Sequence, residues 1–342
     1  MNAESPLRVL WLTPDKPENI SVGRSRLAEH LRERGYTVTV DRTTPRTFIK
    51  RLSERGRYDV VLGTTRAGAI AGIILSRVHG IPLLVDHVDP IAQFRETTSR
   101  PVAAIVERLE RLAFHLARRV LYVYPEEQKR VEAYADATRT NLGVDFERFA
   151  SPDSGRIESV RERLDSIDGS IAVYVGGLEP IYNIRTMLDS LDYLRDWTLV
   201  MAGDGTLRET VERAANGDNG IVYLGTIPHE TIPGLLALAD VGISLVDDPH
   251  TLKVMEYGAA GLPTVQLAGQ AEATLGDAVT YCDLDPSSVA DAIEAAAVAD
   301  ATALRDIAKR HSWKQIAEQY QDAIDEVVST ESGHCGYVDS QR

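Results

Sequence analysis

Hydrophobic residues recur along this chain in two alternating patterns. Short apolar runs rich in β-branched residues predict buried strands. Between these runs, apolar residues return every three or four positions, which predicts amphipathic helices. The expected strands cover 8–13, 37–40, 58–63, 81–85 and 120–123 in the first half, and 171–175, 197–201, 221–224, 241–246 and 279–282 in the second. A regular alternation of strand and helix indicates an α/β protein with parallel sheets.

The length of the chain predicts two domains. A sequence of 342 residues is too long for one typical hydrophobic core. An acid-rich polar stretch, 151–168, interrupts the alternation, and we expect it to link the domains. The first domain then covers 1–150 and the second 151–311, whereas 330–342 has the composition of a flexible tail.

Candidate chemistry gathers in the segment from Leu252 to Val265. The strand-like run 241–246 leads into the polar residues 247–250, and a short helix follows until Gly261 ends it. Open α/β sheets bind ligands beyond the carboxyl ends of their strands, and free amides at a helix start favour phosphate. Lys253 and Glu256 are three residues apart, so both could contact one ligand. The alternative is a solvated ion pair on an ordinary helix.

The residues from Lys253 to Pro263 resemble the donor-site signature of retaining nucleotide-sugar glycosyltransferases of family 4, K-x-x-E-Y-x-A-x-G-x-P. The resemblance extends over residues 8–328. It implies the GT-B architecture of two facing Rossmann-like domains with parallel sheets. It also implies that the closing helix 312–328 packs back on the first domain.

The resemblance assigns a donor site to the second domain. In the family the Glu of the signature bonds the ribose of the donor nucleotide, and here that residue is Glu256. A second Glu is common eight residues upstream, where this chain has Asp248. In the family, glycine turns line the site of the nucleotide base. The resemblance therefore implies that the donor-binding residues here are Gly176, Gly177, Gly203, Gly205 and Ile227, with Leu252 at the helix start.

The cations that hold the donor diphosphate in the family are missing here. Members often read G-R-L-x-x-x-K-G after the first strand of the second domain. This chain has Gly177 at the position of the Arg and Tyr182 at that of the Lys. Because a departing diphosphate needs compensating positive charge, we expect Lys253 to supply it, with Arg185 as the nearest alternative.

Three residues of the first domain are further candidates. The strand 81–85 runs into polar residues, which are costly at a buried strand tip unless they are paired or functional. The family has a His at such a tip, aimed at the transferred sugar, so the resemblance makes His87 and Asp89 catalytic candidates. A structural, fully bonded histidine is the alternative for His87. Gly23, in the loop expected after the first strand, is similar to a family glycine that meets acceptor or phosphate.

Charge and cysteine content restrict the partners and the compartment. The net charge of −14 argues against nucleic acid as a partner. Only six of the 37 basic residues are Lys, an acidic and Arg-rich balance that resembles proteins of a salt-rich, halophilic cytoplasm; high-GC codon bias is the alternative. Two distant cysteines form no disulfide framework, and no signal segment is recognisable, so we expect a cytoplasmic protein.

The stretch 101–119 is amphipathic with interspersed Arg residues. It could lie peripherally against the inner face of a membrane, near a lipid-linked acceptor, or it could be a core-facing helix with a basic edge, which we favour.

These features predict a retaining glycosyltransferase that moves a sugar from a nucleotide-diphosphate sugar to a glycan or lipid-linked acceptor, without a metal cofactor. A non-catalytic nucleotide-sugar-binding protein and another GT-B activity, such as a nucleotide-sugar epimerase, are the alternatives.

Overall fold

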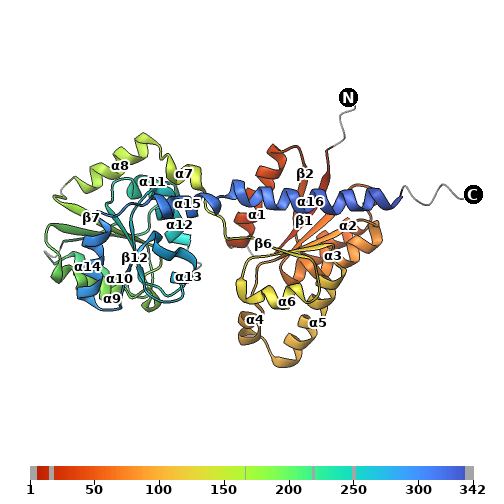
Figure 1. Cartoon of the computed structure of the whole chain (residues 1–342), viewed down its shortest axis with the longest axis horizontal. Coiled ribbons are helices and arrows are strands. Elements are labelled where there is room, and N and C mark those ends of the chain that lie inside the picture. The colour runs from red at the N-terminus through yellow and green to blue at the C-terminus, as the bar shows by residue number, and fades with distance from the viewer. Residues whose placement is uncertain (1–5, 15–18, 166, 218–219, 249–251, 336–342) are drawn as a thin grey trace, which may run out of the picture. The chain divides into compact units, whose positions relative to one another are not determined.

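The computed structural model describes residues 6–14, 19–165, 167–217, 220–248 and 252–335. The chain forms two compact units (Figure 1). Unit 1 consists of Met1–Gly143 and Trp313–Arg342, and unit 2 of Val144–Ser312.

The boundary between the units falls earlier than the predicted position 150. It is followed by α7 (Phe146–Ala150), whose Phe146 and Phe149 are buried in the core of unit 2. These two aromatic side chains assign the segment to unit 2, because burying them is worth far more than any contact of the polar residues between them.

The stretch 151–168 is not the link that we expected. It contains α8 (Ser154–Leu164), which starts where the Asp153 side chain accepts a hydrogen bond from the amide of Arg156. Val160 and Leu164 are buried in the core of unit 2. The helix has the composition of a polar linker because, apart from Ile157 and this narrow apolar stripe, its residues are charged, serine or glycine.

Unit 1 is built on a parallel six-stranded sheet in the order β2-β1-β3-β4-β5-β6. The strands are β1 (Arg8–Thr13), β2 (Thr37–Arg42), β3 (Val60–Thr64), β4 (Leu83–His87), β5 (Arg119–Tyr122) and β6 (Ala137–Arg139). The helices are α1 (Asn19–Glu33), α2 (Pro45–Leu52), α3 (Thr65–His79), α4 (Ile91–Thr97), α5 (Arg100–Leu116), the 3-10 turn η1 (Pro125–Glu127), α6 (Gln128–Glu132) and α16 (Trp313–Cys335). Burial on both faces explains why the central strands are almost uniformly apolar.

The last helix, α16, lies beside α1 in unit 1 (Figure 1). Tyr320 and Ile324 of α16 are buried with Leu27 of α1 over one face of the sheet. The helix continues to Cys335, so residues 330–335 are helical rather than a flexible tail. The remaining residues of the predicted tail, 336–342, lie outside the described part of the chain.

A buried polar cluster joins α16 to the sheet. Asp86, which is fully buried, accepts hydrogen bonds of 2.7 Å from Nε and Nη2 of Arg24, from the Thr64 hydroxyl and from the Tyr320 hydroxyl. Trp11 donates to the Thr64 hydroxyl at 2.8 Å and stacks on Tyr320 with ring centroids 5.5 Å apart. Both carboxylate oxygens of Asp86, one residue before the end of β4, are therefore hydrogen-bonded.

Unit 2 has a second parallel six-stranded sheet, in the order β12-β11-β10-β7-β8-β9. Its strands are β7 (Ser170–Val175), β8 (Trp197–Ala202), β9 (Ile221–Tyr223), β10 (Val241–Ser244), β11 (Thr264–Leu267) and β12 (Thr280–Cys282). The helices besides α7 and α8 are α9 (Ile184–Asp189), α10 (Arg208–Ala215), α11 (Ile232–Leu236), α12 (Leu252–Ala260), α13 (Glu272–Leu275), α14 (Pro286–Ala296) and α15 (Thr302–Arg310), and the 3-10 turns are η2 (Pro180–Tyr182), η3 (Ser190–Tyr193), η4 (His229–Thr231) and η5 (Gly276–Ala278).

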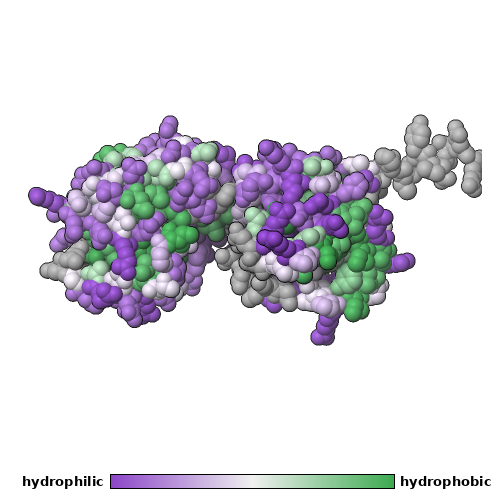
Figure 2. All heavy atoms as spheres, turned by 90° about the horizontal axis from the view of Figure 1, so that it is seen from below, coloured by the Kyte–Doolittle hydropathy of each residue, from purple (hydrophilic) through white to green (hydrophobic). Residues whose placement is uncertain are grey.

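Helix α5 does not turn its apolar stripe toward the core. It buries Ala103, Glu107, Glu110, Ala113 and Phe114, whereas Val102, Ile105, Leu109 and Leu112 on the other side are between 38% and 59% exposed. Figure 2, which views the molecule from the side where α5 lies in Figure 1, shows hydrophobic side chains gathered on this unit. The expectation that this stripe faces the core is thus wrong: the inner face of α5 places Ala113 and Phe114 in the core together with the carboxylate of Glu110, which pairs with Arg66 and Arg130.

Candidate functional site

The carboxyl ends of β7 and β8 border a pocket of about 270 Å³ in unit 2. Strand β7 lies between β8 and β10, where the strand order reverses, and this switch point is where open α/β sheets bind ligands. The lining residues are Val175, Gly176, Gly177, Ala202, Gly203, Asp204, Thr226, Ile227 and Ile232. Four of the residues that the sequence analysis singled out, Gly176, Gly177, Gly203 and Ile227, are therefore brought together in one pocket.

Glycines let the two strand ends approach each other. Gly176 and Gly203 have φ angles of 153° and 147°, which side chains rarely adopt. A Cβ atom on Gly203 would lie 1.8 Å from the carbonyl oxygen of Gly176. Gly205 is not among the lining residues; a Cβ there would lie 2.7 Å from the carbonyl of Leu178, so Gly205 packs against the turn after β7.

Lys253, in the first turn of α12, brings its ammonium group to the side of Gly176. A Cβ on Gly176 would lie 3.2 Å from Lys253 Nζ. Nζ lies 4.4 Å and 4.1 Å from the ring centroids of Tyr174 and Tyr182, and it donates a hydrogen bond of 3.2 Å to the Tyr174 hydroxyl. Burial lowers the pKa of Lys253 to about 8, although the nearby charge of Glu256 acts to raise it.

Glu256 lies on the next turn of α12, with a side chain that is 18% exposed. Its Oε1 lies 3.4 Å from Nε2 of His229, a residue of η4 that packs edge-on against Phe149. Lys253 and Glu256, both in the described part of the chain, do not form the mutual salt bridge of the alternative interpretation. The two side chains of the signature helix are directed to different surroundings, an aromatic pair and an exposed histidine.

Asp248 and Leu252 flank residues 249–251. These three residues, which include Pro249 and His250 of the expected polar loop, lie outside the described part of the chain. Both flanking residues are exposed, and neither is among the lining residues of the pocket. The preceding Asp247 accepts a hydrogen bond of 2.6 Å from the amide of Gln270, which ties this loop to the one after β11.

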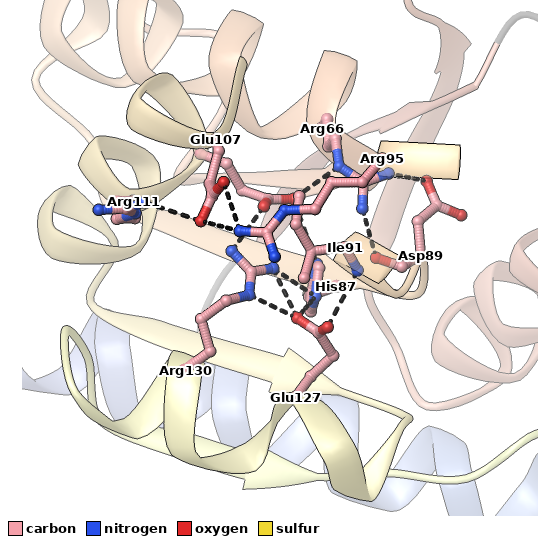
Figure 3. Close-up of polar contacts among 10 residues, drawn as sticks. Arg66, His87, Asp89, Ile91, Arg95, Glu107, Arg111, Glu127 and Arg130 are labelled. Carbon is pink, nitrogen blue, oxygen red and sulfur yellow. Dashed lines mark hydrogen bonds and ion pairs between the residues drawn. The ribbon is translucent and has the colours of Figure 1, made fainter. Parts of the chain in front are cut away.

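In unit 1, His87 ends β4 with a side chain that is only 2% exposed (Figure 3). Its Nε2 lies 2.9 Å from Glu127 Oε2, and its Nδ1 lies 3.6 Å from Glu110 Oε1. Arg130 contacts both carboxylates, at 2.7 Å to Glu110 and 2.6 Å to Glu127. This geometry favours the structural alternative for His87, because both ring nitrogens face buried charged partners.

Asp89 lies at the edge of the same cluster (Figure 3) and is 27% exposed. Arg66 Nη1 lies 3.6 Å from its carboxylate, and Arg66 Nη2 donates a hydrogen bond of 2.7 Å to its backbone carbonyl. Burial raises the pKa of the Asp89 carboxyl, against the opposing charges of Arg66 and His87. Of the two residues predicted at this strand tip, Asp89 is the one that reaches the surface.

Gly23 lies within α1. The prediction that it belongs to a loop is therefore wrong. A Cβ there would lie 2.7 Å from the ring of Trp313. Its small size therefore lets α1 approach the start of α16, a packing reason that the sequence alone did not reveal.

Residues 169–298 match the family model described as "Glycosyl transferases group 1". The matched segment contains the pocket, both strands that border it and the whole of α12. This segment belongs to the group 1 glycosyl transferases.

Two curated relatives are themselves glycosyltransferases. One is the UDP-Gal:alpha-D-GlcNAc-diphosphoundecaprenol alpha-1,3-galactosyltransferase of Escherichia coli, 25% identical over 63% of this chain and 59% of its own length. The other is the GDP-mannose-dependent alpha-(1-6)-phosphatidylinositol dimannoside mannosyltransferase of Mycobacterium tuberculosis, 32% identical over 49% of this chain and 45% of its own length. This chain thus spans about half the length of the curated relatives that it matches.

The fold extends the likeness beyond the matched segment. A crystal structure of Anabaena Alr3699/HepE in complex with UDP and glucose has a TM-score of 0.67 at 17% identity, over 94% of this chain and all of that one. At this identity the likeness concerns the fold alone. This likeness and the two parallel six-stranded sheets, one in each unit, confirm the predicted GT-B fold.

The sequence alone did not identify several charged and aromatic residues that surround the candidate site residues in the two units. They are Tyr174 and His229 in unit 2, and Arg66, Glu110, Glu127 and Arg130 in unit 1. No sequence signal marked Glu110 of α5, because acidic residues opposite an apolar stripe are the usual pattern of a surface helix whose stripe faces the core.

No described helix is long and apolar enough to cross a membrane. Among the same described residues, no three His, Cys, Asp or Glu side chains gather as they would around a metal ion.

Proposed function

We propose that this protein is a retaining glycosyltransferase that moves a sugar from a nucleotide-diphosphate sugar to a glycan or lipid-linked acceptor. The observation that supports it most is the position of the Lys253 ammonium beside Gly176, at the pocket that Gly176 and Gly203 line, within the segment that matches the group 1 glycosyl transferases. The names of the curated relatives include UDP-galactose and GDP-mannose, so they leave both bases as candidates for the donor.

In this reaction the bond between the anomeric carbon of the sugar and the diphosphate oxygen breaks, and its electron pair leaves with the diphosphate. The acceptor hydroxyl forms the new bond on the same face of the sugar, and its proton passes to the departing diphosphate. Lys253 would stabilise the charge that develops on the diphosphate, and Glu256 would accept hydrogen bonds from the ribose hydroxyls. Asp89 of unit 1 stays the catalytic candidate that the family resemblance implies, because its side chain is 27% exposed.

The test is a screen of UDP-glucose, UDP-galactose and GDP-mannose for a rise in melting temperature, followed by an assay for nucleoside diphosphate release with candidate acceptors. Binding to the folded state alone raises stability in proportion to the logarithm of ligand concentration over Kd. The anomeric configuration of the product, read by NMR, distinguishes retention from inversion. We propose that no metal takes part, so turnover should be the same with and without EDTA.

One observation favours a second function, a non-catalytic nucleotide-sugar-binding protein. The turn after β7 has Gly177 and Tyr182 where an Arg and a Lys were expected. Stabilisation by a nucleotide sugar without any turnover across the acceptors would select this alternative. An epimerase would instead change the configuration of the sugar without transferring it to an acceptor.

We also propose that α5 contacts the surface of a membrane on its cytoplasmic side. Its exposed residues Val102, Ile105, Leu109 and Leu112 form one stripe, and Arg108 is exposed on the same helix. An apolar stripe with basic neighbours is the pattern of helices that lie in the interface of anionic bilayers. Relatives named for diphosphoundecaprenol and phosphatidylinositol acceptors support a lipid-bound substrate.

Substitution of Ile105 by Asp tests this contact. Ile105 is 59% exposed, so Ile105→Asp should leave the fold intact while it abolishes co-sedimentation with vesicles of phosphatidylglycerol and phosphatidylcholine in equal parts. Val298→Asp, at a residue of unit 2 that is 89% exposed, is the matched control and should sediment like the wild type. Equal sedimentation of both variants would remove α5 from the proposal.

A further inference from the structure

The Lys253 ammonium is held by aromatic rings rather than by a carboxylate. Its contacts are the faces of Tyr174 and Tyr182 and the Tyr174 hydroxyl, and it forms no salt bridge within the described part of the chain. An ammonium group within about 6 Å of a ring centroid is attracted by the electron density of the ring face. Such rings place the charge without neutralising it, which leaves it available to an anion.

The two tyrosines are themselves fixed by the walls of the pocket. Tyr174 donates a hydrogen bond of 2.6 Å from its hydroxyl to the carbonyl of Gly177. Burial raises the pKa of Tyr174, so the phenol stays protonated and can donate to Gly177 while it accepts from Lys253. Tyr182 lies at the end of η2, and a Cβ on Gly177 would lie 3.2 Å from its ring, so Gly177 makes room for that ring.

The pocket has no other positive charge of its own. None of its nine lining residues, all within the described chain, is basic, and one of them, Asp204, is acidic. An anion in this pocket therefore depends on Lys253 and on the backbone amides of the two glycine turns.

We propose that Tyr174 and Tyr182 are positioning residues that hold the Lys253 ammonium at the Gly176 side of the pocket, as the cation for the diphosphate of the donor. This inference rests on the proposed function of the pocket. It explains why the turn after β7 needs no basic residue of its own. The Tyr182 ring of that turn binds the ammonium group of Lys253, which α12 supplies.

The first test separates the diphosphate from the nucleoside. Tyr182→Leu removes the ring, and Tyr182→Phe keeps it. Loss of one ring should weaken the binding of UDP or GDP roughly 3- to 30-fold, the range from an exposed to a desolvated cation–π contact. The affinity for uridine or guanosine should not change, and Tyr182→Phe should bind the diphosphates as the wild type does.

The second test moves the charge. The ring of Tyr182 already reaches Nζ of Lys253, so a lysine side chain at position 182 can bring its ammonium to the same place. Lys253→Met should lose most of the difference in affinity between UDP and uridine. Tyr182→Lys in the Lys253→Met background should recover it, whereas Ile181→Lys, one residue earlier and 68% exposed, should not.

Failure of this inference can be told apart from failure of the proposed function. If wild-type protein binds neither UDP nor GDP, the function itself is wrong. If it binds and turns over a donor while Tyr182→Leu is unchanged, or weakens nucleoside and diphosphate equally, the tyrosines do not position the cation. The inference holds if Tyr182→Leu and Lys253→Met lose affinity for the diphosphates but not for the nucleosides, and if Tyr182→Lys restores the diphosphate affinity of Lys253→Met.

Discussion

At the scale of single residues, Lys253 carries a charge that the folded state disfavours. Burial lowers its pKa from 10.5 to about 8 among Tyr174, Tyr182 and Glu256, so the folded protein loses the proton at lower pH than the unfolded chain does. At neutral pH this costs on the order of 3 kcal/mol of unfolding free energy, since one pKa unit is about 1.4 kcal/mol. A buried charge of this kind is retained for binding rather than for stability.

Lys253→Met should therefore make unit 2 more stable at neutral pH, by roughly 1–3 kcal/mol, while it weakens diphosphate binding. The wild type gains stability as pH rises from about 8 toward 10.5, because the unfolded chain binds more protons in that window, so the advantage of the variant should shrink there. Chemical denaturation at a series of pH values measures both effects. A variant that is less stable than the wild type at neutral pH would show that the lysine is a structural residue.

Glu256 makes a second prediction at this scale. Glu256→Gln keeps the shape of the side chain but loses charge-assisted hydrogen bonds worth roughly 1.5–3 kcal/mol, so donor affinity should fall at least several-fold. The melting temperature without donor should barely change, because the side chain's contact with His229 is long, at 3.4 Å. Calorimetric titration with the donor measures the loss, and Glu294→Gln on the exposed face of α14 is the control. Unchanged donor affinity in Glu256→Gln would refute the ribose assignment.

At the scale of elements, α16 depends on one hydroxyl group. The Tyr320 hydroxyl donates to the fully buried Asp86 at 2.7 Å and accepts from Arg24 at 3.2 Å. Tyr320→Phe leaves Asp86 short of a donor without changing the packing, which should lower the free energy of unfolding of unit 1 by about 1–3 kcal/mol. Nucleotide affinity should stay the same, because the pocket belongs to unit 2.

Differential scanning calorimetry with and without nucleotide distinguishes the two units in this experiment. Tyr193→Phe, at a tyrosine of η3 that is 60% exposed, is the matched control and should have the wild-type profile. If Tyr320→Phe unfolds like the wild type, the hydroxyl adds nothing to the docking of α16.

At the scale of the whole molecule, the surplus of negative charge predicts a dependence on salt. With a net charge of −14 the folded chain repels itself, and salt at molar concentration shortens the screening length to about 3 Å. The melting temperature and the turnover should therefore rise between low salt and molar KCl. Sucrose at equal osmolarity controls for general exclusion effects. Full activity at low salt, with no gain from KCl, would favour codon bias as the origin of the Lys-poor composition.

Local patterns were sufficient to predict most elements of the fold. The apolar runs at β1, β7 and β8 coincide with the observed strands because both faces of a parallel sheet are buried. The predictions failed where amphipathicity was weak or inverted. The polar sequence of α8 predicts a linker and the pattern of α5 predicts a buried apolar stripe, and both predictions are wrong because residue types alone do not tell which face meets a partner.

For the site, the sequence by itself determined the chemistry at hand: a glycine turn after each central strand, a lysine and a glutamate one turn apart on α12, and no basic residue in the turn after β7. These are local facts, since hydrogen-bonding capacity, charge and backbone freedom belong to the residue. Only the tertiary structure decided the surroundings of each group. It placed Lys253 between two tyrosines from other elements and His87 between two buried carboxylates. Burial and pairing depend on residues that are distant along the chain, and they determine whether a charge serves a ligand or the fold.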